Sequence, residues 1–333
     1  MKKSLVKYLK NGGELGSLAN RPEKRAASEA FPCEPGDVFN IQVAQLARRL
    51  SNIGVKKVVI GISGGLDSAL CLLVAVAAFD KLKLPRENIY TFTMPGFGTS
   101  KRTKSNAGEL SKNLGVSFET ISIVKSCRQH LKDIGHDGTT PDAAFENAQA
   151  RMRTLILMDK ANMVGGIVLG TGDLSEIALG WCTYNGDHIS MFGVNSGVPK
   201  TVVRKVCTWW AQQNDGAAAR ALLDIIDTPV SPELVKGQVT EDKIGPYELH
   251  DFFIWNFIVN GLDAGDLLKA ANIRFKGVYS RETVKKTLHI FLTRLVSQAF
   301  KRNCAPDGIK VFEFDFSPKG WAIPSDMPSD ILL

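Results

Sequence analysis

The residues best suited to chemistry stand in the stretch SGGLDSA, residues 63–69, which interrupts an apolar run. Its glycines allow backbone N–H groups to approach an anion closely, and Ser63 and Ser68 add hydroxyl donors. Asp67 stands in the same turn, where a bare carboxylate would repel phosphate unless a divalent cation lay between them. The composition therefore predicts a site for a nucleoside triphosphate together with Mg²⁺. The glycines assigned to this site are Gly61, Gly64 and Gly65.

Two common phosphate-binding patterns do not describe this turn. A G-x-x-x-x-G-K-[ST] loop requires a Gly-Lys dipeptide, and the chain contains none. The G-x-G-x-x-G pattern of dinucleotide-binding folds is not matched at the turn either. An ordinary glycine turn between a strand and a helix is the competing interpretation, and the surrounding pattern of elements disfavours it.

Strands and helices alternate along the middle of the chain. Continuous apolar, β-branched runs are typical of strands buried on both faces. The expected strands are 57–62, 88–96, 116–123 and 165–173, and the expected helices are 37–53, 66–80, 101–115 and 144–163. In the first of these helices, we expect an apolar face formed by Val38, Ile41, Ala44, Leu46, Leu50 and Ile53. The alternation predicts an α/β fold, a doubly wound parallel sheet with helices on both faces. Beyond about residue 190, we expect a helical C-terminal region with an amphipathic helix over 280–300.

Charge and cysteine usage narrow the class of protein. The net charge is +7, but Lys and Arg alternate with Asp and Glu, so we do not expect nucleic acid as a partner. The six cysteines show no metal-ligand spacing and are typical of reduced core residues in a cytoplasmic protein. The sequence has no apolar run long enough to predict a membrane span.

The S-G-G-x-D-S stretch resembles the signature of the ATP pyrophosphatases, which leaves several families open. Three further blocks favour one of these families: FENAQARMRT, GTGDLSEIALGWCTY and KIGPYELHDF resemble NAD synthetase. They are most similar to the synthetase domain of the glutamine-dependent enzymes. The resemblance covers Phe31 to the C-terminus. It implies an adenine nucleotide alpha hydrolase-like fold, with residues 1–30 as a linker or N-terminal arm and residues 31–333 as the synthetase domain.

The resemblance also implies a reaction. A carbon–nitrogen ligase of this family uses ATP and Mg²⁺ to adenylate deamido-NAD, and ammonia then displaces AMP to give NAD. We expect this chain to lack a glutaminase domain, because the residues before Phe31 are too few to hold one. The sequence leaves open whether the chain is part of a longer enzyme and whether a glutaminase domain or subunit delivers the ammonia. The family resemblance further implies a homodimer or a higher homo-oligomer.

Roles for individual residues follow from the same resemblance. Asp67 and Glu176 are expected to hold Mg²⁺, and Lys200, Thr201 and Asp173 are expected to take part in catalysis together with Asp67. Thr171 matches a threonine that contacts ATP, and Arg102 is a candidate ATP contact because it lies just past the second expected strand. The residues expected to contact deamido-NAD are Asn147, Arg151, Glu176, Trp181, Cys182, Thr183, Tyr184, Asp187 and Lys301.

Several of these residues have plainer interpretations. Glu176 also suits the first turn of a helix as an acid that complements the dipole. Trp181 also suits simple packing, and Arg102 and Lys200 also suit a solvated surface or loop. Arg151 and Arg153 lie two apart on one helix, so only one of them is expected to reach a ligand.

Two other functions remain as alternatives. Another amidating ATP pyrophosphatase, such as a GMP synthetase relative, is disfavoured by the block GTGDLSEIALGWCTY. A non-catalytic nucleotide-binding module is disfavoured by the presence of Asp67, Glu176 and Lys200 together.

Overall fold

A computed structural model of the chain describes residues 3–11, 14–99, 101–228, 234, 240–317, 320–323, 327–328 and 330–333. The described strands are β1 (Val58–Gly61), β2 (Ile89–Thr93), β3 (Ser117–Thr120), β4 (Ile167–Gly170) and β5 (Phe192–Gly193). They form one sheet in the order β3-β2-β1-β4-β5, and every pairing is parallel. The predicted doubly wound α/β fold is confirmed.

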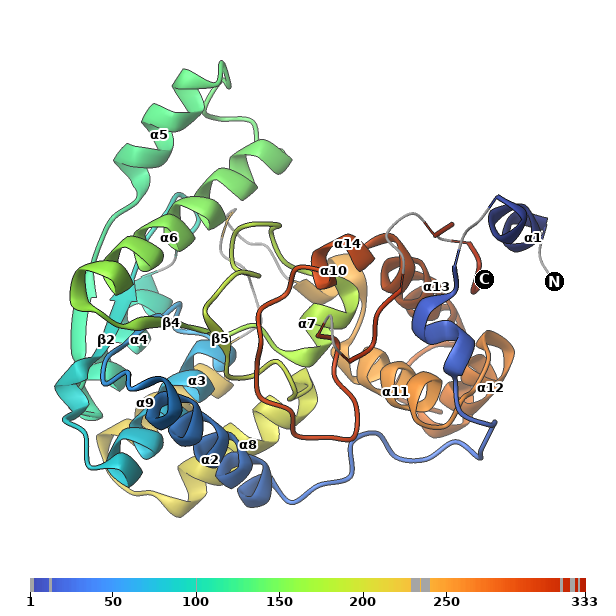
Figure 1. Ribbon diagram of the computed structural model, residues 1–333, viewed down its shortest axis with the longest axis horizontal. Helices are drawn as coiled ribbons and strands as arrows, with labels where there is room; N and C mark the ends of the chain where they lie inside the picture. Colours follow the sequence, from blue (N-terminus) through green and yellow to red (C-terminus); the bar gives the residue numbers. More distant parts are fainter. Residues whose placement is uncertain are drawn as a thin grey trace.

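Helices cover both faces of the sheet (Figure 1). One face carries α5 (Val124–Asp133) and α6 (Ala143–Val164), and the other carries α2 (Pro35–Ile53), α3 (Leu66–Leu82), α4 (Lys101–Asn113), α8 (Lys200–Gln213) and α9 (Ala217–Ile226). Side chains of β1 alternate between these layers, since Val58 and Ile60 pack with α3 whereas Val59 packs on the α6 side. All three are fully buried, which explains their continuous apolar run.

Helix α2 agrees only in part with the expected apolar face. Helix α2 spans the predicted region, but Ile41 is 38% exposed and Ile53 is 41% exposed. Val38, Leu46 and Leu50 are buried as expected, and Phe39, Gln42 and Val43 also belong to the buried face. Gln42 is buried because its side chain donates to the Val194 carbonyl at 3.0 Å, a contact that apolar periodicity does not reveal.

The topology places the ends of β1 and β4 side by side. From β1 the chain winds outward to β2 and β3, and β4 then returns to pair with the other edge of β1. Loops at such a switch point leave a crevice at the carboxyl ends of the strands, where ligands of doubly wound folds bind. Asn195 joins the two loops, because its amide donates to the Asp67 carbonyl at 2.8 Å and to the Thr171 carbonyl at 3.0 Å.

A group of helices packs beside the sheet (Figure 1). It consists of α7 (Leu174–Leu179), α10 (Thr240–Ile244), α11 (Tyr247–Ile258), α12 (Ala264–Arg274), α13 (Arg281–Ser297) and α14 (Ala299–Arg302). Ser280 caps α13 by accepting from the Thr283 N–H at 3.0 Å, which agrees with the helix predicted from residue 280. The predicted helical C-terminal region is confirmed. Within the described residues, no helix combines the length and apolarity that a bilayer span requires.

The N-terminal residues include α1 (Lys3–Lys10), which the sequence analysis did not predict, and η1 (Gly16–Asn20). After η1 the chain runs along α11. Arg21 donates to the carbonyls of Phe257 and Leu262 at 3.2 and 2.6 Å, and its guanidinium lies 3.8 Å from the centre of the Phe257 ring. The boundary between an arm over residues 1–30 and a domain over 31–333 stays a prediction.

Candidate functional site

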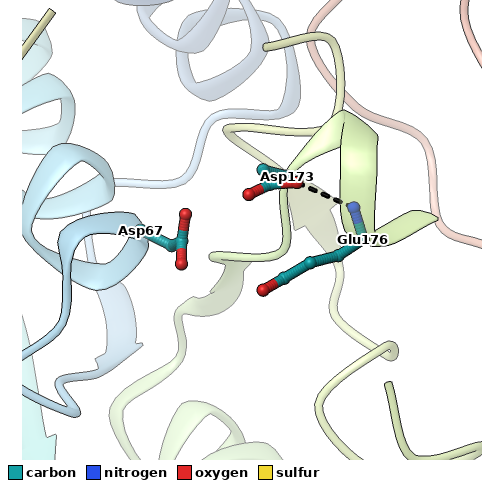
Figure 2. Close-up of side chains that lie close together, drawn as sticks. All are labelled: Asp67, Asp173 and Glu176. Atoms are coloured by element: carbon teal, nitrogen blue, oxygen red, sulfur yellow. Dashed lines mark hydrogen bonds between the residues drawn. The ribbon is translucent and has the colours of Figure 1, made fainter. Parts of the chain in front are cut away.

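The turn after β1 is folded by its own hydroxyl groups. Gly64 has a φ of 84°, a conformation that favours glycine. Ser63 Oγ accepts from the Gly65 N–H at 3.1 Å, and Ser68 Oγ donates to the Gly65 carbonyl at 3.0 Å. Helix α3 begins at Leu66, so Asp67 lies in its first turn and faces the end of β4 (Figure 2).

The turn after β4 supplies two more acids. Asp173 caps α7 by accepting from the Glu176 N–H at 2.8 Å, the contact drawn in Figure 2. The cap orients the Asp173 carboxylate, and the side chains of Asp173 and Glu176 both point toward Asp67 (Figure 2). Asp173 is fully buried, whereas the Glu176 side chain is 20% exposed. Glu176 is therefore an acid in the first turn of α7, which agrees with its interpretation as a residue that complements the helix dipole. It is also a member of a carboxylate cluster.

Lys200 lies at the centre of this cluster. It is the first residue of α8, and its side chain is only 5% exposed. Its Nζ lies 2.6 Å from Asp67 Oδ2, 2.7 Å from Asp173 Oδ2 and 2.9 Å from Glu176 Oε1. The interpretation of Lys200 as a solvated loop lysine is therefore wrong, and its ammonium joins the loops after β1 and β4.

Burial and mutual repulsion govern the charges of the cluster. Burial raises the pKa of Glu176 to about 7, and Asp67 adds to the rise while Lys200 opposes it. Burial likewise raises the pKa of Asp173 well above its usual range. For Lys200, burial alone would lower the pKa, but the three surrounding carboxylates together raise it well above the usual value. The ammonium is therefore the stable countercharge of the cluster.

The three acids have the chemistry of a divalent-cation site. One oxygen from each of Asp67, Asp173 and Glu176 lies within 4.8 Å of the others. Hard oxygen ligands are those that Mg²⁺ prefers. Asp67 Oδ1 is buried and accepts no hydrogen bond from any residue that the structure describes, so it is free to bind a cation. The sequence analysis placed only Asp67 and Glu176 at the metal, and the geometry adds Asp173.

A pocket opens beside Glu176. Four of the residues expected to contact deamido-NAD or Mg²⁺ line it: Glu176, Cys182, Asp187 and Lys301. Lys301 Nζ also donates to the carbonyls of Gly180 and Cys182 at 2.8 and 2.7 Å, so it closes the C-terminus of α7. The pocket and the carboxylate cluster therefore share Glu176.

The loop from Trp181 to Asp187 is held by α6. Asn147 Oδ1 accepts from Thr183 Oγ1 at 2.8 Å, and Arg151 Nε donates to the Tyr184 carbonyl at 3.1 Å. Asp187 Oδ1 accepts from the Thr183 N–H at 2.7 Å. These expected substrate residues thus form one connected wall.

Other predicted residues lie elsewhere or have structural contacts. Trp181 packs against the core, and the Arg294 guanidinium lies 5.1 Å from its ring centre, in line with the packing interpretation. Arg153 donates to the Met94 carbonyl at 3.1 Å, so it contacts a different loop from Arg151. Arg102 lies in α4, and its side chain is outside the described part of the chain.

The sequence analysis missed two groups that support the site. Asp251 accepts from Thr201 Oγ1 at 2.6 Å, so the Thr201 hydroxyl faces the interior. Arg302 donates to the Ala178 carbonyl at 2.8 Å and thereby holds the far end of α7. Neither residue lies near a glycine turn, and no spacing pattern links them to Asp67.

Comparisons with known proteins agree on one family. The family model described as NAD synthase matches residues 38–301. A glutamine-dependent NAD(+) synthetase of Mycobacterium leprae is 40% identical over 92% of this chain and 51% of its own length. The chain spans about half the length of the curated relatives it matches.

Solved structures are similar as well. Glutamine-dependent NAD+ synthetase from Acinetobacter baumannii in complex with ADP is 25% identical, with a TM-score of 0.55 over 90% of this chain and 51% of that one. NMN synthetase from Francisella tularensis is 26% identical, with a TM-score of 0.59 over 74% of this chain and 95% of that one.

Proposed function

Because this chain belongs to the NAD synthase family, we propose that it catalyses the ATP- and Mg²⁺-dependent amidation of deamido-NAD to NAD, with ammonia as the nitrogen donor. It would act as a carbon–nitrogen ligase. The observation that carries this proposal is the cluster of Asp67, Asp173, Glu176 and Lys200 at the carboxyl ends of β1 and β4. The similarity to a synthetase solved with ADP supports ATP as the nucleotide.

The proposed reaction has two steps. A carboxylate oxygen of deamido-NAD attacks the α phosphorus of ATP, and the bond to the β phosphate breaks to release pyrophosphate. Ammonia then attacks the acyl carbon, the bond to AMP breaks, and one proton is released as the amide forms. Both steps gather negative charge on phosphate oxygens, so fixed donors and cations should dominate the site.

The chain's own residues supply those donors. The glycine turn from Ser63 to Gly65 precedes the N-terminus of α3 and is proposed to hold the phosphates, which would replace the bonds that the Ser63 and Gly65 N–H groups donate within the turn. Asp67, Asp173 and Glu176 would hold Mg²⁺, which when bound would shield the phosphate charge. Lys200 supplies a compact cation with movable donors, which suits the charge that develops during adenylation. Thr171 and Arg102 are further proposed ATP contacts.

Deamido-NAD is proposed to bind beside Glu176. The pocket there would bring its reacting carboxylate close to the carboxylate cluster, where the nucleotide phosphates would lie. Asn147, Arg151 and the loop from Trp181 to Tyr184 would form the outer wall, with Asp187 and Lys301 inside the pocket. This arrangement would give a role to the hydrogen bonds that Asn147 and Arg151 of α6 make with that loop.

A second candidate substrate is the mononucleotide that carries the same nicotinate carboxylate. The similarity to the Francisella tularensis NMN synthetase favours this mononucleotide, because that protein is matched over 95% of its own length. The chemistry at the carboxylate would be identical, so only substrate binding distinguishes the two. Comparing kcat/KM for deamido-NAD and for nicotinate mononucleotide decides between them, and we expect deamido-NAD to be preferred.

The nitrogen source and the assembly are also proposals. We expect ammonium to support NAD formation by this chain and glutamine not to, since ammonia would come from a glutaminase domain or subunit. A homodimer or higher homo-oligomer and a cytoplasmic location complete the proposal. The six cysteines are all unpaired, as a reducing compartment would keep them. NAD formation with glutamine alone would overturn the assignment of the nitrogen donor.

A further inference from the structure

We propose that Asp251 is a positioning residue, which holds the N-terminus of α8 against α7 and thereby places Lys200 among the three carboxylates. The proposal rests on the proposed function only for what Lys200 does in the reaction. Asp251 lies in α11, far along the chain from every residue of the cluster. It is 1% exposed. Its carboxylate therefore acts through neighbouring side chains and not on a substrate.

Both oxygens of Asp251 are engaged. Oδ2 accepts from the Thr201 N–H at 2.9 Å and from Thr201 Oγ1 at 2.6 Å, while Oδ1 accepts from the Ser175 hydroxyl. Ser175 Oγ in turn accepts from the Lys200 N–H at 2.9 Å. The first two N–H groups of α8 are thus bound, directly or through Ser175, to one buried carboxylate.

This contact replaces an ordinary helix cap. The first N–H groups of a helix have no partners within the helix. Pro199 stands at the N-cap position of α8, and no side-chain cap is formed there. The Asp251 carboxylate supplies the missing acceptor from another helix, and its negative charge complements the positive end of the α8 dipole.

The contacts of Asp251 join the two helices that carry cluster residues. Ser175 stands in α7 between the two cluster acids Asp173 and Glu176, and Lys200 begins α8. Asp251 therefore links the backbone that carries two of the carboxylates to the backbone that carries the ammonium. Without it, the bond from the Leu174 N–H to the Val198 carbonyl at 3.0 Å still joins α7 to the segment before α8, but the Thr201 N–H and hydroxyl lose their acceptor.

A lysine ammonium signal tests the inference without using activity. Protein containing ¹⁵N-lysine is examined for a slowly exchanging Nζ signal, which a buried ammonium bonded to three carboxylates should give. The signal is assigned by its loss in Lys200→Met. We expect Asp251→Ala to abolish it and Asp251→Asn to keep it. Asn can accept from Thr201 with its oxygen and donate to Ser175 Oγ with its amide nitrogen.

Kinetics give the second readout. We expect Asp251→Ala to lower kcat by about thirtyfold while the KM values for ATP and deamido-NAD stay within about threefold, and Asp251→Asn to restore most of kcat. Thr91→Val is the matched control, because buried Thr91 donates to the Ser117 carbonyl at 2.8 Å on the opposite side of β1. It should be destabilised and yet keep both the signal and kcat.

Three results would overturn the inference: an ammonium signal that persists in Asp251→Ala, one that is lost equally in Thr91→Val, or one that is absent from the wild type. If Asp251→Ala does not fold, Thr201→Val decides, since it removes one contact to Asp251 and should weaken the signal. A wild-type chain that makes no NAD but shows the Asp251-dependent signal would contradict the proposed function and leave the positioning role standing.

Discussion

The Nζ of Lys200 lies 2.6 Å from Asp67 Oδ2, although the two residues are 133 positions apart in the sequence. This contact joins the first residue of α8 to the first turn of α3. It also places an ammonium among the carboxylate oxygens that would bind a divalent cation. An ammonium and a metal ion cannot occupy the same space, so binding of one should weaken binding of the other.

Replacing Lys200 with Met should therefore tighten metal binding in the absence of nucleotide. We expect the Kd for Mn²⁺, measured by electron paramagnetic resonance titration, to fall by about tenfold, because no cation then competes for the carboxylates. The same variant should lose about a hundredfold in kcat, because a cation near the phosphates is lost. Lys205→Met, an exposed lysine of the same helix, is the control and should change neither value. Unchanged or weaker Mn²⁺ binding in Lys200→Met would contradict the competition.

Replacing Arg302 with Met should destabilise the fold. Arg302 is 3% exposed and donates to the carbonyls of Ala178 and Leu295, so Met would leave buried carbonyls without donors. We expect a loss of about 3 kcal/mol in the free energy of unfolding, measured with urea. Arg204→Met removes one exposed contact to the Ile226 carbonyl and should cost less than about 1 kcal/mol. Equal losses in the two variants would disprove the role given to Arg302.

The stability of the protein should fall in mild acid because of His250. This side chain is fully buried between the rings of Tyr247 and Phe291, and burial lowers its pKa to about 4, with the charge of Arg294 adding to the effect. The unfolded chain takes up a proton near pH 6.5, whereas the folded chain does so only near pH 4. Keeping His250 neutral therefore costs no stability above the unfolded pKa. The free energy of unfolding falls as the pH drops from the unfolded pKa toward the folded pKa.

Comparing wild type with His250→Gln separates the effect of His250 on stability from that of the acids whose pKa values are raised. Between about pH 7.5 and about pH 5, wild type should lose about 2 kcal/mol more of its free energy of unfolding than His250→Gln. His289→Gln, a change at an exposed histidine, should behave like wild type. The account fails if His250→Gln shows the same pH dependence as wild type.

Local patterns in the sequence predicted β1 to β4 and the glycine turn, whereas the roles of the site residues were expected from the family resemblance. The run Val58–Gly61, the glycine turn after it and the acids at 67 and 176 each have a short-range signal. Parallel strands bring their carboxyl ends to one edge, so the meeting of Asp67 with Glu176 follows from topology. β5 is only two residues long, and no periodicity can reveal such a strand.

The remainder depends on contacts between distant segments. The sequence around Lys200 is compatible with an exposed loop, and only the packing of α8 against α7 shows that this lysine is buried. Asp251 and Arg302 lie in apolar or basic helices whose residue patterns carry no sign of their partners. Gln42 lies between Val38 and Leu46 at helical spacing, so its position is on the buried face of α2, but only the structure shows that Val194 and Asn195 accept from its amide there.

The central claim is tested most directly by measuring AMP, pyrophosphate and NAD formed from ATP, deamido-NAD, MgCl₂ and ammonium chloride, with wild type and Asp67→Asn compared. The account expects wild type to form all three products in equal amounts and to stop when Mg²⁺ is removed. Asp67→Asn should retain the fold and lose at least about a hundredfold in kcat. A folded wild-type protein that binds ATP but forms no NAD, or an Asp67→Asn variant as active as wild type, would contradict it.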